Sequence, residues 1–242
     1  MNGKKSPFKR QTSTRSKISG ERIWSDVKQV SEKSIQGCTY AVCFVDDCTR
    51  RGKSYPMKSK TEVFDKWEQY LNEKILARGK SVRYFRSDNG TEYNAVTAFN
   101  NVRGILSEKS PPYCQSMDGV GEVYWRETFK LVRNILWDQQ REAKWWAAAL
   151  GFADHLRNHI MTKSVPDAPP ESLWQGKTTD VSHFKVPLCP CWAYIESENR
   201  EDKSLGQRRM QGVFVGYASN SPCYLVRDDV SGWVYPRRYA DV

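Results

Sequence analysis

The 242-residue sequence has no long apolar run, since no stretch of about 18 consecutive apolar residues occurs in it. Its N-terminus also lacks the apolar segment of a secretory signal peptide. We therefore expect a soluble intracellular protein with no membrane partner. Because 39% of the residues are hydrophobic and 12% are aromatic, the chain still has enough apolar side chains to build a globular core.

Motifs for zinc and for disulfides are also missing. None of the seven cysteines forms a Cys-x-x-Cys pair, and the closest two, Cys189 and Cys191, have one proline between them. We interpret the cysteines as reduced thiols. His155 and His159 have the i, i+4 spacing of a helical zinc site, but no Glu-x-x-His motif or third ligand accompanies them. We interpret both as surface or core histidines.

Positive charge is concentrated near the N-terminus. The net charge is +10, and residues 1–20 contain no acidic residue but six basic ones, which are Lys4, Lys5, Lys9, Arg10, Arg15 and Lys17. This Ser/Thr-rich segment is predicted to be a disordered basic arm. Two interpretations remain open: a tether to the phosphate backbone of DNA, through residues such as Lys9 and Arg10, or a solubilising linker.

The apolar pattern predicts alternating strands and helices from residue 21 onward. Strands are expected over 21–30, 38–46 and 54–58, where Pro56 indicates an edge strand. A helix should begin at the Ser59/Glu62 capping box and end at Gly79. Next come a strand over 81–87, a short helix over 94–104, a weak strand over 105–110 and long helices from 119 and over 143–161. This order is that of a ribonuclease-H-like α/β domain.

Turn residues and short strands fill the C-terminal part. Prolines make residues 165–182 a predicted linker, and short strands are expected over 184–194, 210–217, 223–227 and 233–239. These strands predict a small β barrel. The expected organisation is an arm over 1–20, an α/β core over 21–164, the linker, and a barrel over 183–242.

Three carboxylates stand at element ends. Glu122 lies at the start of the helix that begins at Gly119, and Asp26 and Asp88 lie where strand-like segments give way to polar residues. On that helix Arg126, Lys130 and Arg133 share the sector of Glu122, and Trp125, Phe129, Val132 and Leu136 form the adjoining apolar sector. The three acids are predicted to converge on a metal, although a lone Asp at a strand end is commonly a turn residue.

Other acidic and aromatic residues receive structural interpretations. Asp46 and Asp47 are expected to form a turn with a salt bridge to Arg50, and Glu92 to be a solvated neighbour of Asp88. The tryptophans at 125, 137, 145 and 146 are expected in the core or at a subunit interface rather than stacked on bases.

Four motifs then occur in order: Trp24–Val27, Phe44–Arg50, Arg86–Tyr93 and the stretch from Pro112 to Glu122. They resemble the successive motifs of integrases from copia-type LTR retrotransposons. The resemblance continues through Pro170–Lys177, Val181–Val186 and Gly212–Tyr217, which are similar to the region between the integrase core and the reverse transcriptase, including its SH3-like barrel. It covers about residues 20–242.

The resemblance implies a ribonuclease-H-like core, with a mixed five-stranded sheet flanked by helices, followed by the SH3-like barrel. It implies a catalytic triad of Asp26, Asp88 and Glu122 that holds two Mg²⁺ (or Mn²⁺) ions, which is the donor set that phosphoryl transfer needs. Such a polynucleotidyl transferase joins the 3′ ends of element DNA to target DNA in the nucleus, as a homo-oligomer. Arg126, Lys130 and Arg133 would lie against DNA phosphates.

The chain departs from the family pattern near Glu122. Asp88 and Glu122 are 122 − 88 = 34 positions apart, which is tighter than usual, and Val123 stands where the family has a basic residue. Tyr124 and Trp125 follow where polar residues are expected. A catalytically decayed, DNA-binding remnant of the same family therefore remains the alternative interpretation.

Overall fold

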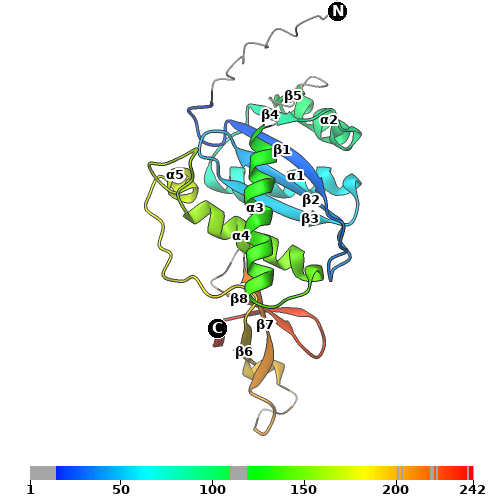
Figure 1. Cartoon of the computed structure of the whole chain (residues 1–242), viewed down its shortest axis with the longest axis vertical. Coiled ribbons are helices and arrows are strands. Elements are labelled where there is room, and N and C mark those ends of the chain that lie inside the picture. The colour runs from blue at the N-terminus through cyan, green and yellow to red at the C-terminus, as the bar shows by residue number, and fades with distance from the viewer. Residues whose placement is uncertain are drawn as a thin grey trace, which may run out of the picture.

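Two β-sheets, joined by helices, carry the residues of interest (Figure 1). The computed structural model describes residues 15–109 and 119–241, apart from the side chain of Asn199 and the whole of Glu201, Lys203, Ser219, Asn220, Pro222 and Tyr239. The predictions for Lys9, Arg10 and the loop over 110–118 fall outside these residues.

The first sheet has five strands in the order β3-β2-β1-β4-β5. They are β1 (Arg22–Gln29), β2 (Tyr40–Asp46), β3 (Gly52–Met57), β4 (Tyr84–Ser87) and β5 (Leu106–Lys109). β1, β2 and β3 pair antiparallel, and β4 and β5 join parallel to β1. The mixed five-stranded sheet is thus confirmed, with β3 and its Pro56 at an edge as predicted.

Alternate residues of β2 supply a hydrophobic cluster to each face of this sheet. Val42 and Phe44 face the cluster that α1 (Val63–Tyr70) and α2 (Asn94–Val102) cover, whereas Cys43 and Val45 belong to the other. The predicted Ser59/Glu62 capping box opens η1 (Lys60–Glu62) ahead of α1. The helix continues as η2 (Leu71–Ile75) and η3 (Leu76–Arg78) and ends at Gly79, whose φ is 63°. Another short turn, η4 (Thr91–Tyr93), precedes α2.

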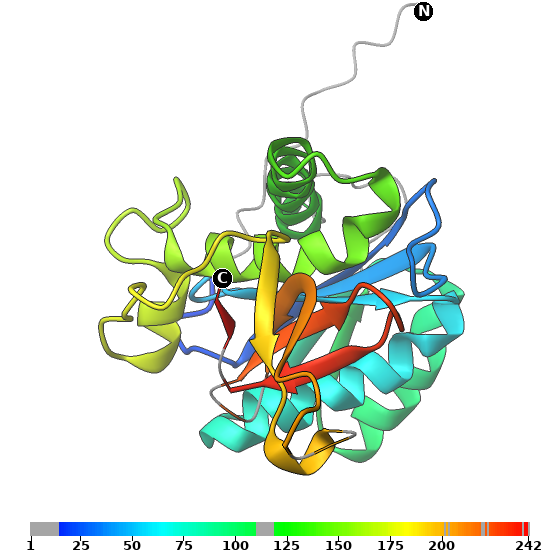
Figure 2. The ribbon, with the colours of Figure 1, turned by 90° about the horizontal axis from the view of Figure 1, so that it is seen from below.

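The opposite face carries α3 (Gly119–Asp138) and α4 (Trp146–His159), the latter preceded by η6 (Ala143–Trp145). Figure 2 shows α3 end-on on one side of the sheet and the helices α1 and α2 on the other. Trp125, Trp145 and Trp146 are buried in the core as expected. Trp137 lies on α3 with 88% of its surface exposed, so it is not a core residue.

The expected linker over 165–182 contains a short helix, α5 (Pro170–Gln175). Pro170 stands at its first position and Gly176, with φ 69°, ends it. Trp174 anchors α5, because its ring is buried and lies under the guanidinium of Arg51 at 5.1 Å. Six residues are too few to show a helical apolar period, which explains why sequence reasoning missed this element.

The second sheet is antiparallel, in the order β10-β6-β7-β8-β9. Its strands are β6 (Pro190–Tyr194), β7 (Arg209–Tyr217), β8 (Tyr224–Asp228), β9 (Val234–Arg237) and β10 (Ala240–Asp241), with η7 (Ser197–Asn199) between β6 and β7. The strand predictions hold in outline, although β6 begins at Pro190 rather than 184. In the described residues β9 and β10 are the sheet edges, and an SH3-like barrel is not confirmed.

α4 lies between the two sheets and contacts both β3 and β7. Phe152 of α4 packs edge-on against Phe214 of β7, with ring centroids 5.0 Å apart. The hydrophobic cluster on this face therefore includes residues of both sheets, from Cys43 in β2 to Val226 in β8.

The last residues of the predicted disordered arm are anchored on the first sheet, which corrects the expectation for residues 15–20. Arg15 donates hydrogen bonds to the carbonyl oxygens of Asp47 (3.0 Å) and Ser164 (2.8 Å). The amide of Gly20 donates to Asp46 Oδ1 at 2.8 Å. These contacts join residues far apart in the chain, so no local sequence pattern reveals them.

Within the described ranges, no helix is long and apolar enough to span a membrane.

Candidate active site

Strand pairing places Asp26 beside Asp88. β1 and β4 run parallel with Trp24 opposite Arg86, and each aspartate lies two positions further along its chain. Tyr93 is buried nearby, and its hydroxyl is 3.0 Å from Ser25 Oγ. Burial raises the pKa of Tyr93, and the negative charges of Asp26 and Asp88 raise it further. Both carboxylates are thus near one hydroxyl.

The first turn of α3, which contains Glu122, packs against β1 at Asp26. Gly121 is buried directly against Asp26, because a Cβ at position 121 would lie 2.7 Å from Asp26 Cβ and 3.2 Å from its Oδ2. Glu122 is the next residue and is exposed to solvent. The helix end that carries Glu122 therefore packs on β1 at Asp26, and the convergence of the three carboxylates stays a prediction.

The carboxylates are not arranged as a ready metal site. In the parts of the chain that the structure describes, no group of three or more His, Cys, Asp or Glu side chains is placed to hold a metal ion. Asp88 is exposed, and its Oδ1 accepts a hydrogen bond from the amide of Gly90 at 3.0 Å. The role of Asp26, Asp88 and Glu122 as metal ligands stays a prediction.

Glu92 is not the solvated neighbour of Asp88 that the sequence suggested. Only 10% of its side chain is exposed, and Oε1 pairs with Lys60 Nζ at 3.1 Å. A Cβ at Gly90 would touch both this carboxylate and that of Asp88, at 3.0 Å from Asp88 Oδ1. Glu92 therefore places a second acidic group close to Asp88, held by its ion pair with Lys60.

The exposed face of α3 carries the predicted DNA-binding residues. Arg126, Lys130 and Arg133 are all exposed, and the buried face contains Trp125 and Val132 as predicted. Arg126 Nε lies 3.4 Å from the neighbouring Glu127. The helix therefore presents a basic strip that starts one turn after Glu122.

A buried polar network fixes the rotation of α3. Tyr124 packs directly on Gly52, and its hydroxyl donates to Asp154 Oδ1 and lies 3.0 Å from Ser54 Oγ. Asp154 also accepts from the amide of Ser54 at 2.6 Å. Burial raises the pKa of Asp154, while Lys53 and these hydrogen bonds lower it. The aromatic residue at 124, a departure from the family pattern, thus orients the helix that carries Glu122.

Sequence reasoning missed this network because Ser54 and Asp154 are 100 positions apart. No local spacing links them. The only local signal was Asp154 itself, an acidic residue among the apolar residues of its helix.

Asp46 and Asp47 form the turn expected of them. Asp46 Oδ2 accepts from the amide (2.8 Å) and hydroxyl (2.7 Å) of Thr49, and burial raises the pKa of Asp46. Asp47 Oδ1 pairs with Arg50 Nη1 at 2.8 Å. The predicted salt bridge is confirmed.

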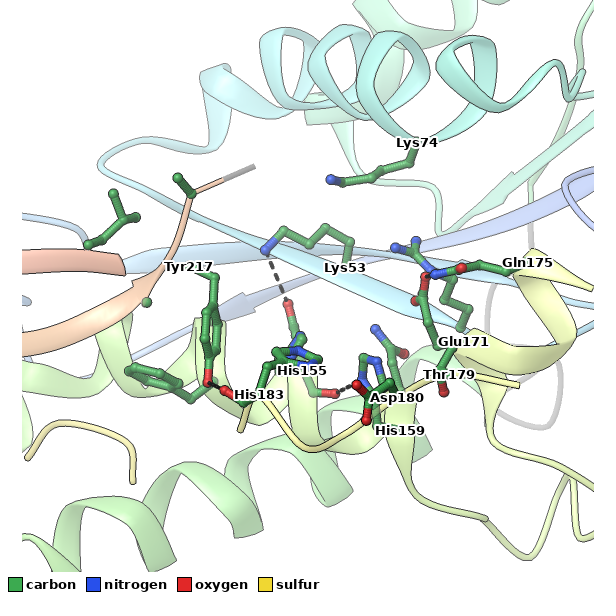
Figure 3. A pocket seen from close by; sticks show the side chains of 18 of the residues that line it. Lys53, Lys74, His155, His159, Glu171, Gln175, Thr179, Asp180, His183 and Tyr217 are labelled. Carbon is green, nitrogen blue, oxygen red and sulfur yellow. Dashed lines mark hydrogen bonds and ion pairs between the residues drawn. The ribbon is translucent and has the colours of Figure 1, made fainter. Parts of the chain in front are cut away.

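The three histidines of the chain meet in a separate pocket of about 710 Å³ between α4, α5, β3 and β7 (Figure 3). The rings of His155 and His159 are 4.5 Å apart, and His183 lies 5.6 Å from His155 between ring centroids. His183 is the neighbour that sequence spacing could not supply. Burial and the other two histidines lower the pKa of His155 to about 4, so its ring is neutral at physiological pH.

No sequence profile of a known protein family matches the chain. It is 29% identical, over 94% of its length, to the retrovirus-related Pol polyprotein from transposon TNT 1-94 of Nicotiana tabacum. It is also 29% identical, over 97% of its length, to the corresponding polyprotein from transposon RE2 of Arabidopsis thaliana. The chain spans only 17% and 16% of these two proteins.

Solved structures share the fold. One is a chain of the simian T-cell lymphotropic virus intasome in complex with PP2A regulatory subunit B56 gamma, with a TM-score of 0.54 and 14% identity over 93% of this chain and 79% of that one. Another is the catalytic core domain of BIV integrase, with a TM-score of 0.50 and 16% identity over 65% of this chain and 95% of that one. At these identities the likeness establishes a ribonuclease-H-like core and does not by itself establish an activity.

Proposed function

This chain is homologous to one segment of the retrovirus-related Pol polyproteins of plant transposons, and from that homology we propose that it is an integrase. The proposed reaction joins the 3′ ends of element DNA to target DNA by metal-dependent phosphoryl transfer. The attacking group is water in the first step, which frees a 3′-hydroxyl, and that hydroxyl in the second.

One observation carries the proposal. It is the parallel register of β1 with β4, which leads to Asp26 and Asp88 two positions beyond the Trp24–Arg86 pair, together with the contact of Gly121 with Asp26. A helix that carries one acid and packs on a strand that carries another supports the proposal of metal-dependent chemistry on phosphates.

The donor set fits Mg²⁺ or Mn²⁺, because Asp26, Asp88 and Glu122 offer hard carboxylate oxygens and two of the three are exposed to solvent. We assign two ions to these residues; when bound, such ions neutralise charge on the attacking and leaving oxygens. The chain's own contribution is positional. The Gly90 amide holds Asp88 by its Oδ1, and the Tyr124 network sets the angle of Glu122.

DNA is the proposed partner of the basic strip Arg126, Lys130 and Arg133. Exposed guanidinium and ammonium groups along a helix bind phosphates without reading bases, so they would position the substrate. The intasome likeness supports an oligomeric assembly on DNA, which we propose for this chain, together with action in the nucleus. The antiparallel second sheet, which follows the core, is the proposed SH3-like part.

The test is Mg²⁺-dependent strand transfer with Glu122→Gln and, as a matched control, Glu127→Gln. Both changes remove one exposed acid from the same helix. Glu122→Gln should lower the rate by at least about a hundredfold while DNA affinity stays within about twofold, because only a metal-neutralising charge is lost. Equal loss of activity in both variants, or full activity of Glu122→Gln, would contradict the assignment.

A decayed, DNA-binding remnant is the second candidate, and Val123 in place of a basic residue favours it. In that case the wild type binds DNA as well as Glu122→Gln does and shows neither cleavage nor joining in Mg²⁺ or Mn²⁺.

A further inference from the structure

The histidine pocket between α4, α5, β3 and β7 is separate from the proposed active site, since none of the three carboxylate residues lines it. Its volume of about 710 Å³ is within the range of small-molecule sites. Figure 3 shows Lys53 and Lys74 extending over the pocket, opposite the rings of His155 and His183. One wall of the pocket is therefore cationic, and the opposite wall is formed by the imidazole rings of His155 and His183.

Each cation of this wall has one carboxylate nearby, but two of the three ion pairs are long: Lys53 Nζ lies 4.0 Å from Asp154 Oδ2 and Lys74 Nζ lies 3.6 Å from Glu73 Oε2. Lys74 and Lys53 approach from η2 and β3, next to Arg51. Burial, followed by the positive charges of Lys53 and Arg51, lowers the pKa of Lys74. Its ion pair with Glu73, at 3.6 Å, is with its own sequence neighbour. Because charge-assisted hydrogen bonds are normally about 2.7–2.9 Å long, the ammonium groups of Lys53 and Lys74 remain available to a further anion that would join the three cations.

Two buried nitrogen atoms in this pocket have no hydrogen-bond partner among the described residues: Arg51 Nη1, which is a donor, and His155 Nε2. Arg51 uses Nε on Glu171, at 2.6 Å, and its side chain is only 11% exposed. Leaving a buried donor unpaired is costly, and native proteins rarely do so without a ligand, ion or water at the site. The unused side of the guanidinium therefore indicates a missing acceptor.

The acids of the pocket do not supply that acceptor, because each is already engaged. Asp154 accepts hydrogen bonds from Tyr124 and Ser54. Glu171 accepts from Arg51 and from Gln175 at 2.8 Å, and Asp180 accepts from Ser182 at 2.7 Å.

We propose that this pocket binds a phosphate-bearing small molecule, whose phosphate is received by Arg51, Lys53 and Lys74. Phosphate fits because it accepts several charge-assisted hydrogen bonds at once, including from an arginine fork. The opposite wall, where Tyr217 lies 5.0 Å from the ring of His155 and 5.7 Å from that of His183, suits a flat group attached to the phosphate. A nucleotide has both parts, whereas pyrophosphate has only the first.

The test is calorimetric titration of the full chain with pyrophosphate and with ATP. EDTA is present, so that metal-bridged binding at Asp26 and its neighbours does not contribute. Lys74→Gln should weaken binding by roughly tenfold or more, since one charged hydrogen bond to phosphate is lost. The matched control is Lys66→Gln, on the adjoining helix α1 and outside the pocket, which should bind as the wild type does. Glu122→Gln should also bind normally, which keeps this result independent of the integrase assignment.

Equal affinity for pyrophosphate and ATP would show that the phosphates alone are recognised. Tighter binding of ATP would show that the rings of His155, His183 and Tyr217 also contribute. Both outcomes support the proposal. No heat of binding at millimolar ligand, or equal binding by Lys74→Gln, would overturn it. A DNA oligonucleotide that displaces ATP and that itself loses affinity in Lys74→Gln would instead make this a nucleic-acid surface, which also overturns the small-molecule assignment.

Discussion

Gly121 offers a steric test of the site, because it is where α3 touches Asp26. In Gly121→Ala the new methyl carbon would stand 2.7 Å from Asp26 Cβ. Carbon atoms in contact are normally about 3.5–4.0 Å apart, so the helix end and the strand must separate by about 1 Å. Asp26 Cβ belongs to a paired strand next to buried residues and cannot swing aside.

Two opposing effects set the stability of this variant. Alanine in a helix interior is favoured over glycine by about 1 kcal/mol, whereas overpacking costs about 1–3 kcal/mol. We therefore expect a net loss of roughly 0–2 kcal/mol and a protein that still folds. Activity is the sensitive readout, because a displacement of about 1 Å in a reacting site can cost about a hundredfold in rate.

The control is Gly119→Ala in the same turn, where an added Cβ meets nothing within 4 Å. Urea denaturation gives the stabilities, strand transfer gives the rate, and Mn²⁺ binding followed by electron paramagnetic resonance reports the site without turnover. We expect Gly121→Ala to lose rate and Mn²⁺ affinity and Gly119→Ala to lose neither. Normal Mn²⁺ binding and rate in Gly121→Ala would refute the claim that this contact positions Glu122.

Three further changes have defined outcomes. Deleting residues 1–14 removes four cations, and if all contact phosphates the slope of log affinity against log salt should fall by up to about 3.6; an unchanged slope means that this segment does not touch DNA. Tyr124→Phe removes one of the donors to buried Asp154, which keeps those of Ser54, and should cost about 1–3 kcal/mol in urea unfolding. His155, whose pKa is lowered from 6.5 to about 4 in the folded protein, should make stability fall as pH drops through that window, since the unfolded chain takes up the proton first. The loss is about 1–2 kcal/mol after allowance for partial exposure, and His155→Phe should remove it; an unchanged pH profile would contradict the lowered pKa.

The local signals of the sequence predicted most of the first sheet. The apolar run of β2, the Ser59/Glu62 capping box and the stop at Gly79 each reflect short-range chemistry, and each is confirmed. α5 was missed because six residues carry no measurable period. The anchoring of Arg15 was missed because its acceptors lie 32 and 149 positions away.

The sequence predicted which residues belong to the candidate site, but it did not predict the contacts that hold those residues in place. Element ends marked Asp88 and Glu122, and helical spacing marked the basic strip of α3, but Asp26 lies inside β1 (Arg22–Gln29) and not at the predicted strand end. The ion pair of Glu92 with Lys60 and the contact of Tyr124 with Asp154 depend on how distant elements meet, which residue types alone do not encode.

The position of α4 between both sheets has a consequence for how the chain unfolds and for how it can be divided. Phe152 and Phe214 are both buried in one hydrophobic cluster, so the second sheet buries Phe214 only by packing on α4, which also covers the first sheet. We expect the two sheets to melt in a single cooperative transition, as one thermodynamic unit. A shortened chain that ends after α5 would expose Phe152 to water and would aggregate. A domain boundary for expression should therefore not be placed between the two sheets, because it would divide their shared hydrophobic core.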